Sequence, residues 1–318
     1  MNEVTLTVSS PPHWHTGQKI SRITYGLMIA LIPAVILGIV NYKMHAVSVL
    51  SVAIVSAMAA EAIMQYAMKR PLSLTDGSAA LSGLLLALML PASAPWWLVV
   101  VGSMVGIVVG KQIFGGLGGY PFNPVLIGWA IIRISWPGHL NLDDVLVNFN
   151  LGNIPMADPL TTLKTSGTAG LNIFSYGNLL IGKQLGGIGA TASLWLLIGG
   201  LFAIIRGYIP WRIPASFILG ILLASSLYWF ANKTASPLFH ILTGNVMLGA
   251  FFLATESTTS PVNNWAMVLF GVGCGILTML IRIYGIYPDG VVFAILLMNM
   301  VNPLLDKIRP RVIGKVSP

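Results

Sequence analysis

Residues 75–124 read TDGSAALSGLLLALMLPASAPWWLVVVGSMVGIVVGKQIFGGLGGYPFNP, and this stretch decides the fold. It joins a short apolar segment, a break, a longer apolar segment and a glycine-rich turn. A weaker copy of the same order returns at residues 242–290. Its landmarks keep nearly constant offsets from the first copy: Gly83 to Gly249, Trp97 to Trp265, and Tyr120 with Pro121 to Tyr287 with Pro288. A repeat of interrupted apolar segments is typical of membrane proteins that bind a ligand between two halves.

The composition excludes a soluble globular protein. Of the 318 residues, 56% are hydrophobic and 8% are charged, and the mean hydropathy is +0.83. Soluble domains carry roughly 25% charged residues, and a helix needs about 20 apolar residues to cross a bilayer. The apolar segments are continuous and do not alternate with polar residues, which excludes a transmembrane β-barrel. We therefore expect an all-α polytopic membrane protein.

Ten apolar segments fall into two sets of five on either side of a polar stretch. The predicted segments are 23–40, 47–68, 78–90, 96–114, 124–136, 185–205, 213–230, 243–255, 265–281 and 291–301. Because five is an odd number, the second set is expected to be inverted relative to the first, as two inverted five-helix repeats. The predicted division is a polar N-terminal arm at 1–22, a first repeat at 23–136, an inter-repeat loop at 137–184, a second repeat at 185–303 and a basic tail at 304–318.

The third and eighth segments are too short to cross the bilayer as straight helices. Residues 78–90 would rise only about 20 Å, at roughly 1.5 Å per residue. Short segments in matching places of two repeats point to a binding site in the membrane. Two interpretations stay open: re-entrant segments that form such a site, or tilted spans that are slightly short.

The net charge of +8 fits a lipid bilayer as the partner and not nucleic acid. Lys and Arg stand singly or in pairs at the ends of apolar segments, as the positive-inside bias requires. Their distribution predicts that both termini are cytoplasmic. The single cysteine, Cys274, excludes disulfides within the chain and cysteine-ligated iron–sulfur clusters. We expect no metal site, since His13 and His15 offer too few ligands.

Five stretches of the sequence carry a family resemblance. They read SPPHWHTGQKISRITYGLMIALIPA, DGSAALSGLLLALMLPASAPWW, GKQIFGGLGGYPFNP, FFLATESTTSPV and YPDGVVFAILLMNMVNPLLD. In these blocks, and in their order over both halves, the chain resembles the RnfD family, the D subunits of Rnf ion-translocating oxidoreductases. The NqrB proteins of the sodium-translocating NADH:quinone reductases share this core but are typically longer, so the Rnf type is the nearer resemblance.

The resemblance implies a membrane subunit of an electron transport complex in the cytoplasmic (inner) membrane. Such complexes couple electron transfer between ferredoxin and NAD, or another carrier, to the movement of Na⁺ or H⁺. The expected partners are the other Rnf subunits, with membrane, iron–sulfur and flavin subunits among them. The chain would then be one subunit of a translocase that is not catalytic alone, and we expect no catalytic residue in it.

The resemblance also implies flavin. Members usually join FMN through its phosphate to the threonine of an S/T-G-A-T-P-L motif in the inter-repeat loop, and a second, non-covalent riboflavin is thought to lie in the membrane part. Here residues 155–160 read PMADPL, so Asp158 stands where the acceptor threonine belongs. A carboxylate forms no stable phosphoester and repels the FMN phosphate. We therefore predict that covalent FMN is absent and that a non-covalent flavin, riboflavin or FMN, is the cofactor.

The glycine-rich turn is the candidate flavin site. Gly115 and Gly116 allow close backbone approach to a flat ring, and Asn123 and Pro124 open the next helix, whose first amides are donors. The other interpretation of this stretch is a tight turn between two helices. Gln112 stands where related quinone reductases tend to carry an acid, which argues against a cation site there.

Four acidic residues are candidates for an ion pathway: Glu61, Asp76, Glu256 and Asp289. Glu61 lies deep inside an apolar segment, where an ionisable residue costs roughly 2.5–3.5 kcal/mol on insertion and usually serves a path or a pair. An ion or proton role for Glu61 and a structural pair with a Lys or Arg of another helix both stay open. The other three residues border the interrupted segments, where they are placed either to coordinate a cation or to cap helices.

Two rival functions stay open. A duplicated five-helix half also suits an inverted-repeat solute channel or transporter without redox activity. A scaffold that has lost its redox role is the third interpretation, because Asp158 replaces the acceptor threonine. Flavin content separates an electron carrier from a channel, which would be colourless.

Overall fold

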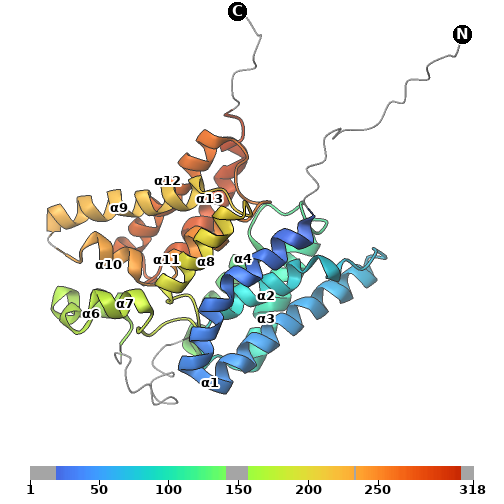
Figure 1. Ribbon diagram of the computed structural model, residues 1–318, viewed down its shortest axis with the longest axis horizontal. Helices are drawn as coiled ribbons and strands as arrows, with labels where there is room; N and C mark the ends of the chain where they lie inside the picture. Colours follow the sequence, from blue (N-terminus) through green and yellow to red (C-terminus); the bar gives the residue numbers. More distant parts are fainter. Residues whose placement is uncertain (1–18, 141–156, 233, 309–318) are drawn as a thin grey trace, which may run out of the picture.

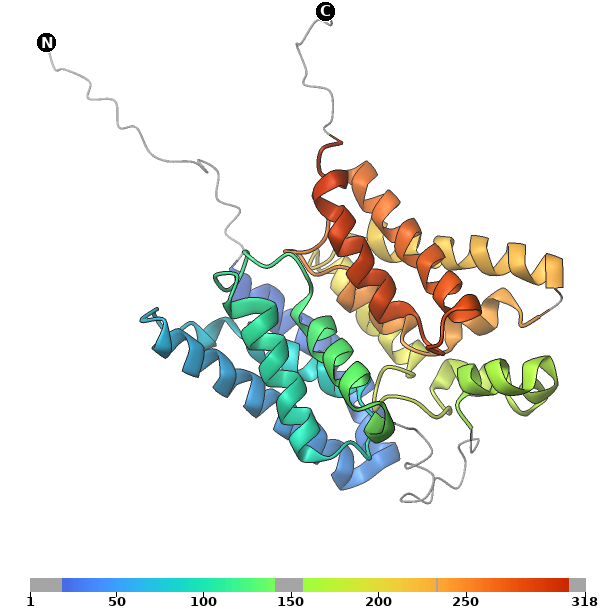
Figure 2. The same ribbon diagram turned by 180° about the vertical axis from the view of Figure 1, so that it is seen from behind.

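A computed structural model describes residues 19–140, 157–232 and 234–308, and every regular element in these ranges is a helix. Figures 1 and 2 show two groups of helices side by side, one from each half of the chain. The first group consists of α1 (Ile20–Ala67), α2 (Ser78–Met89), α3 (Trp96–Ile107) and α4 (Pro124–Ser135). The second group consists of α8 (Ser193–Ile205), α9 (Arg212–Asn232), α10 (Pro237–Leu242), α11 (Val246–Leu248), α12 (Asn264–Tyr284) and α13 (Val291–Leu305).

Short elements complete these two groups. The 3-10 turns are η1 (Leu74–Asp76), η3 (Pro137–Leu140) and η4 (Gly167–Ile173), and the π-helical turns are η2 (Val108–Gln112) and η5 (Gly249–Leu253). Helices α6 (Pro159–Ser166) and α7 (Tyr176–Ile181) lie between the halves in sequence. Single π-turns inside helices are rare and occur often at functional sites.

The chain is an all-α, multi-pass membrane protein, as expected. Helices α1, α9 and α12 are long and apolar enough to cross a membrane, with mean hydropathies of 2.4, 1.7 and 2.1. Helices α2, α4, α8 and α13 are shorter and apolar, and α3 continues through η2 as one apolar helix, Trp96–Gln112.

Helix α1 contains the first two predicted segments. Lys43, with φ of 51° and ψ of −131°, is not helical and separates two arms, which form a V in Figure 1. The second arm packs closely against α2, because a Cβ at Gly83 would lie only 2.5 Å from the carbonyl oxygen of Ala53. This close approach places the end of the second arm, which carries Glu61, beside the start of α2.

The sixth predicted segment is helical only from Ser193, so the prediction of a helix over 185–192 was wrong. The amides of Ile188, Gly189 and Ala190 donate to the carbonyls of Leu88 and Leu90 at distances of 2.9, 3.1 and 3.0 Å. Carbonyls at a helix C-terminus have no partner within their own helix, and membrane-embedded backbone must be satisfied by protein. The non-helical stretch therefore closes the C-terminal end of α2.

The eighth predicted segment, 243–255, is helical only over α11 and the π-turn η5 that directly follows it, and the short helix α10 precedes the segment. The break between α10 and α11 contains Gly244 in the left-handed region, at φ of 69°. Gly77 has the same conformation, at φ of 74°, directly before α2. These two glycines are 167 positions apart (244 − 77), the offset that the sequence repeat predicts.

Small residues let helices approach within each half and between the halves. A Cβ at Gly275 of α12 would lie 2.4 Å from the carbonyl oxygen of Phe217 on α9. A Cβ at Gly199 of α8 would lie 1.9 Å from the carbonyl oxygen of Ala30 on α1. Without a hydrophobic driving force in lipid, such close packing is what holds membrane helices together. The halves therefore meet along α1 and α8.

The described part of the inter-repeat loop packs against the second half. Leu160 of α6 and Leu179 of α7 share a buried apolar cluster with Phe239 and Leu242 of α10. Lys164 of α6 donates to the carbonyl of Tyr287, at 3.1 Å, and to that of Gly285.

Candidate functional site

A buried ion pair joins α1 to the π-turn η2. The Nζ atom of Lys111 lies 2.7 Å from Oε1 of Glu61, and each side chain is only 1% exposed. Lys111 belongs to η2, where the wider turn displaces residues from regular α-helical positions. Of the two roles open for Glu61 from the sequence, the geometry contains the pair with a basic residue of another helix, and the ion role stays a hypothesis.

Amide and hydroxyl groups surround this pair. The Nε2 atoms of Gln112 and Gln65 donate to Oε1 of Glu61 at 2.9 and 3.2 Å. Lys111 also donates to Oγ of Ser78, at 2.6 Å. Oε1 of Glu61 thus accepts three hydrogen bonds, whereas its Oε2 is buried and accepts none from any described residue.

Asp76 extends this hydrogen-bonded network through Ser78. Its Oδ1 accepts hydrogen bonds from the amide and the hydroxyl of Ser78, at 2.8 and 2.7 Å. These bonds hold the first turn of α2, so the helix-capping interpretation of Asp76 agrees with the geometry. Through Ser78, Asp76 also orients the hydroxyl that Lys111 contacts.

A cavity of about 460 Å³ lies between the two halves, and we call it the inter-half cavity. Its polar wall contains Thr24, Ser78, Ser82, Lys111, Tyr120, Thr255, Glu256, Ser257 and Thr258, and its apolar wall contains Ile20, Ile23, Leu27, Leu81, Leu85, Leu117, Ile209 and Phe252. Ligand pockets typically have volumes of about 300–1,000 Å³ with mostly apolar walls and a few placed polar groups. The inter-half cavity has this character.

The glycine-rich turn connects the halves beside this cavity. The hydroxyl of Tyr120 donates to Oε1 of Glu256 at 2.8 Å. The side-chain amide of Asn123 donates to the carbonyl of Leu253 in η5 at 3.0 Å, and its oxygen caps α4 by accepting from the amide of Val125 at 2.9 Å. Figure 2 shows this turn, in green, meeting the orange loop that follows η5.

The residues predicted for flavin contact lie near the inter-half cavity but not among its lining residues. Gly115 is exposed and its carbonyl accepts from Arg70, while Gly116 precedes the part of the turn that reaches the cavity. Asn123 and Pro124 are buried in the packing between helices. Other members of the same turn, Leu117, Gly118 and Tyr120, form the cavity wall.

Asp289 takes part in a second ion pair, in the other half. Its Oδ1 lies 3.0 Å from Nη2 of Arg282, which also donates to the carbonyl of Thr243 at 2.9 Å. The other carboxylate oxygen, Oδ2, accepts from the amide of Asn245 at 2.8 Å. Arg282 and Asp289 therefore satisfy the backbone groups that the break between α10 and α11 exposes.

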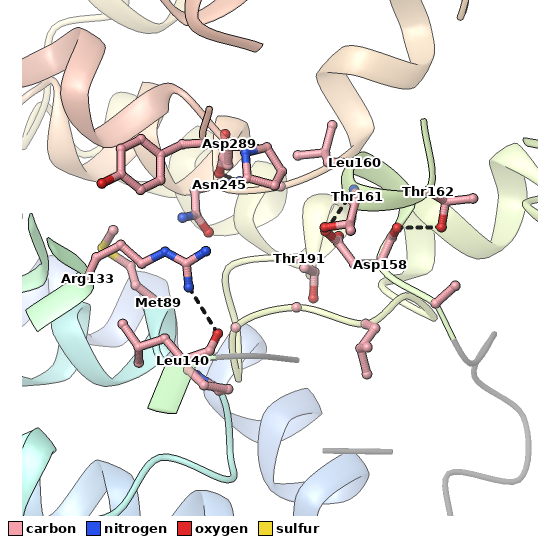
Figure 3. Close-up of a pocket in the computed structure, with 18 of the residues that line it drawn as sticks. Met89, Arg133, Leu140, Asp158, Leu160, Thr161, Thr162, Thr191, Asn245 and Asp289 are labelled. Atoms are coloured by element: carbon pink, nitrogen blue, oxygen red, sulfur yellow. Dashed lines mark hydrogen bonds between the residues drawn. The ribbon is translucent and has the colours of Figure 1, made fainter. Parts of the chain in front are cut away.

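A second cavity, of about 290 Å³, contains Asp158 in its wall, and we call it the loop-side cavity (Figure 3). Figure 3 shows Arg133 and Asn245 on one side of it and Asp158 with Thr161 and Thr162 on the other. The carboxylate of Asp158 caps α6 and accepts from the amide and hydroxyl of Thr161 at 3.0 and 2.5 Å. Burial raises the pKa of the Asp158 carboxyl above its usual range, and the hydrogen bonds from Thr161 oppose that shift.

No group of three or more His, Cys, Asp and Glu side chains that could hold a metal ion occurs within the described ranges. His13 and His15 lie outside the residues that the structure describes.

Comparison with known proteins identifies the family. Residues 7–314 match the family described as NQR2, RnfD, RnfE, which is nearly the whole chain. The chain belongs to this family. The resemblance inferred from the five sequence blocks is thereby confirmed.

Relatives of this family share the full length of the chain. It is 39% identical to the D subunit of the Na⁺-translocating ferredoxin:NAD⁺ oxidoreductase complex of Acetobacterium woodii, covering 96% of this chain and 94% of that protein. It is 38% identical to the D subunit of the proton-translocating ferredoxin:NAD⁺ oxidoreductase complex of Clostridium ljungdahlii, covering 95% and 94%. It is 37% identical to the D subunit of the ion-translocating oxidoreductase complex of Cronobacter sakazakii, covering 98% and 99%.

The sequence of this family member did not by itself indicate Lys111, Tyr120 and Arg282 as site residues. Lys111 ends an apolar run and resembles a residue anchored at the membrane surface, yet η2 directs it inward. One signal was present, because a carboxylate as deep as Glu61 requires a buried cation. Arg282 had a similar signal in Asp289, seven positions later and just before α13.

Proposed function

We propose that the chain is the membrane-embedded D subunit of an Rnf-type complex that couples electron transfer between ferredoxin and NAD⁺ to translocation of Na⁺ or H⁺. The family membership, the full-length similarity to D subunits of complexes with these names, and the multi-pass fold support this proposal. The chain has one cysteine, so the iron–sulfur clusters belong to partner subunits. It therefore works as one member of a complex, with the other Rnf subunits as partners.

The proposed architecture is two inverted five-helix repeats, 23–136 and 185–303, in the cytoplasmic (inner) membrane. The left-handed glycines Gly77 and Gly244, which start the short segments of the two halves, support the repeat. The start of α1 and the end of α13 lie toward the same end of the molecule in both views, which supports cytoplasmic termini for both (Figures 1 and 2). The wall of the inter-half cavity includes Ile20, Ile23 and Thr24 at the start of α1, whereas α6 lies toward the other end of the molecule (Figure 1).

The inter-half cavity is the proposed place for a non-covalent flavin, and this cavity is the observation that carries the redox part of the proposal. Its volume of about 460 Å³ and its mixed wall suit a flat ring with polar edges. Lys111 has three N–H groups, of which Glu61 and Ser78 accept two, so one is left for a ring oxygen or nitrogen. When bound there, a flavin supplies one- or two-electron relay.

The charges in this cavity favour a flavin without phosphate. Lys111 is the cation in the cavity wall, and its charge is already balanced by Glu61. Glu256 adds a carboxylate to the same wall and would repel a phosphate. Riboflavin therefore fits these residues better than FMN.

The residues of the chain would position this flavin and shield it. Tyr120 and Glu256 close the cavity where the two halves meet. Leu81, Leu85 and Phe252 keep one wall apolar and exclude water from it. Lys111 would hold a hydrogen bond to the ring while its own position is set by Glu61 and Ser78.

The Asp158 side of the loop-side cavity, where the family's FMN would be attached, does not fit a phosphate group. Helix N-termini bind phosphate through free amides, but at α6 the Asp158 carboxylate already accepts the hydrogen bond of the Thr161 amide. A second anion beside that carboxylate would be repelled. We therefore propose that covalent FMN is absent, and in-gel ultraviolet fluorescence of this protein after denaturing electrophoresis would contradict that.

The flavin proposal is tested by filling the inter-half cavity in the intact complex. Ser82→Trp places a large ring in the cavity wall, whereas Val55→Trp places the same ring on an exposed part of α1 as a matched control. We expect Ser82→Trp to release one phosphate-free flavin per complex, measured by chromatography of the denatured protein, and Val55→Trp to release none. Complete retention of that flavin in an assembled Ser82→Trp complex would contradict the assignment. A colourless wild-type protein with solute flux would favour a channel instead.

A further inference from the structure

The Glu61 carboxylate forms a cation site that the chain fills with its own ammonium group. The Nζ atom of Lys111 contacts two oxygens, Oε1 of Glu61 at 2.7 Å and Oγ of Ser78 at 2.6 Å. Carboxylate and hydroxyl oxygens are the ligands that a hard cation prefers. The second oxygen of Glu61, Oε2, is buried and has no partner among the described residues. The site therefore holds one cation and has an oxygen left for another ligand.

Charge balance forbids leaving this site empty. A buried carboxylate without a counter-charge is strongly unfavourable, and breaking a buried pair by removing one partner is strongly destabilising. The other close neighbours of Glu61 are the neutral amides of Gln65 and Gln112. Asp76, the next carboxylate, is held by Ser78 and adds negative charge. Whenever Lys111 leaves Glu61, another cation must therefore replace it.

Lys111 has a second acceptor available across the inter-half cavity. Both Lys111 and Glu256 line this cavity, one from each half of the chain. The described contacts of the Glu256 carboxylate consist of one hydrogen bond, from Tyr120, so it has capacity for more donors. A lysine side chain is a flexible four-carbon stem that carries a compact charge, which suits movement between two carboxylates.

We propose that Glu61 and Ser78 form a site for a small monovalent cation, Na⁺ or a proton, and that Lys111 is a tethered ammonium that vacates this site by moving to Glu256, which lines the same cavity. Each state then contains one positive charge at Glu61, either the ammonium or the incoming cation. Added negative charge in the cavity draws Lys111 away from Glu61 and admits a cation. The cation bound at Glu61 is taken to be the cation that the complex transports, and in this respect alone the proposal rests on the proposed function.

A zero-length cross-linking experiment tests the movement directly. A membrane-permeant carbodiimide joins a lysine amine to a carboxylate that it touches, as an amide, and peptide mass spectrometry then identifies the pair. In the intact complex without Na⁺ at neutral pH, we expect the link between Lys111 and Glu61 to dominate. Adding the cation that the site binds should raise the ratio of the Lys111–Glu256 link to the Lys111–Glu61 link several-fold.

Two series of conditions distinguish the cations. A rise with Na⁺ at constant pH assigns a sodium site, and a rise on acidification at constant Na⁺ assigns a proton site. In Glu61→Gln, the Lys111–Glu256 link should form at a level that neither condition changes. Carbodiimide modification of the exposed Asp306, at the end of α13, serves as the internal control for reagent activity.

Failure of this inference is separable from failure of the proposed function. Absence of the Lys111–Glu256 link under every condition, in Glu61→Gln as well, would overturn the proposal that Lys111 moves between Glu61 and Glu256. Flavin content, measured on the same samples, reports on the flavin proposal independently. A complex with its flavin but without the second link would keep the electron carrier and reject the tethered cation.

Discussion

The hydroxyl of Tyr120 donates a 2.8 Å hydrogen bond to Oε1 of Glu256, and this contact ties the glycine-rich turn of the first half to the loop after η5 in the second. Beside it, Asn123 donates to the carbonyl of Leu253 in η5. Both residues of the Tyr120–Glu256 pair line the inter-half cavity. This contact between the halves is thus also part of the proposed flavin site.

Tyr120→Phe should loosen the junction between the halves. The substitution removes the donor and leaves a carboxylate oxygen of Glu256 without its partner, which costs about 1–3 kcal/mol. We expect a lower temperature of flavin release from the complex, measured by flavin fluorescence during heating. Tyr25→Phe, which removes a long 3.4 Å hydrogen bond at an exposed position, is the control and should change little. Equal release temperatures for wild type and Tyr120→Phe would contradict a role of this bond in the site.

The Glu61–Lys111 pair should show strong coupling in a double-mutant cycle. Lys111→Met alone leaves a buried carboxylate unpaired and should destabilise the protein by about 3–5 kcal/mol. Glu61→Gln combined with Lys111→Met removes both charges, so much of that loss should be recovered. The denaturant midpoint is measured for complexes of the wild type, each single variant and the double variant, which are the four members of the cycle. Additive losses, with the double variant as unstable as the sum of the singles, would show that the two groups do not interact.

Asp158→Ala should act on α6 and not on flavin content. Loss of the helix cap costs about 0.5–2 kcal/mol, so α6 should become more sensitive to limited proteolysis. Thr165→Ala, at the C-terminal part of the same helix, is the matched control. Released flavin should stay at the wild-type amount in both variants. Loss of flavin in Asp158→Ala would instead move the flavin site to the loop-side cavity.

Gly244→Ala should be more damaging than Gly77→Ala, although both glycines have a left-handed backbone. The shared conformation costs a non-glycine residue about 1–2 kcal/mol at either position. At Gly244 the new Cβ would also lie 2.8 Å from Nη2 of Arg282, whereas at Gly77 the nearest atom is at 3.4 Å. The yield of assembled complex should fall further for Gly244→Ala. The reverse order would contradict the packing around the Arg282–Asp289 pair.

The fold class followed from composition, because only long apolar helices tolerate so few charges in lipid. The breaks were harder to locate. The absence of charged residues over 185–205 suggested a helix that begins at Leu185, but in the fold the amides at 188–190 satisfy the open carbonyls of α2. That partner is about a hundred positions away in sequence (188 − 90 = 98 for Ile188 and Leu90), and periodicity within one segment carries no information on it.

The carboxylates of the candidate site could be predicted from the sequence, but the basic residues that pair with them were harder to predict. Glu61 stood out because its neighbours are apolar, and Asp289 because it borders an interrupted segment. Lys111 did not stand out in the sequence, because its side chain points inward only through a π-turn. A single extra residue in a helical turn has no clear sequence signature. Flavin contact at Gly115 and Gly116 stays a prediction, and it is their neighbours Gly118 and Tyr120 that line the inter-half cavity.

In the proposed function, this protein couples electron transfer to cation movement through the buried Glu61 site. The direct measurement is ferredoxin-driven cation uptake into inverted membrane vesicles, expressed per NAD⁺ reduced, for wild type, Glu61→Gln and the exposed control Asp306→Asn. Glu61→Gln should assemble and retain flavin but lose most of its uptake per NAD⁺ reduced, while Asp306→Asn should match wild type. Unchanged uptake in Glu61→Gln would contradict the account.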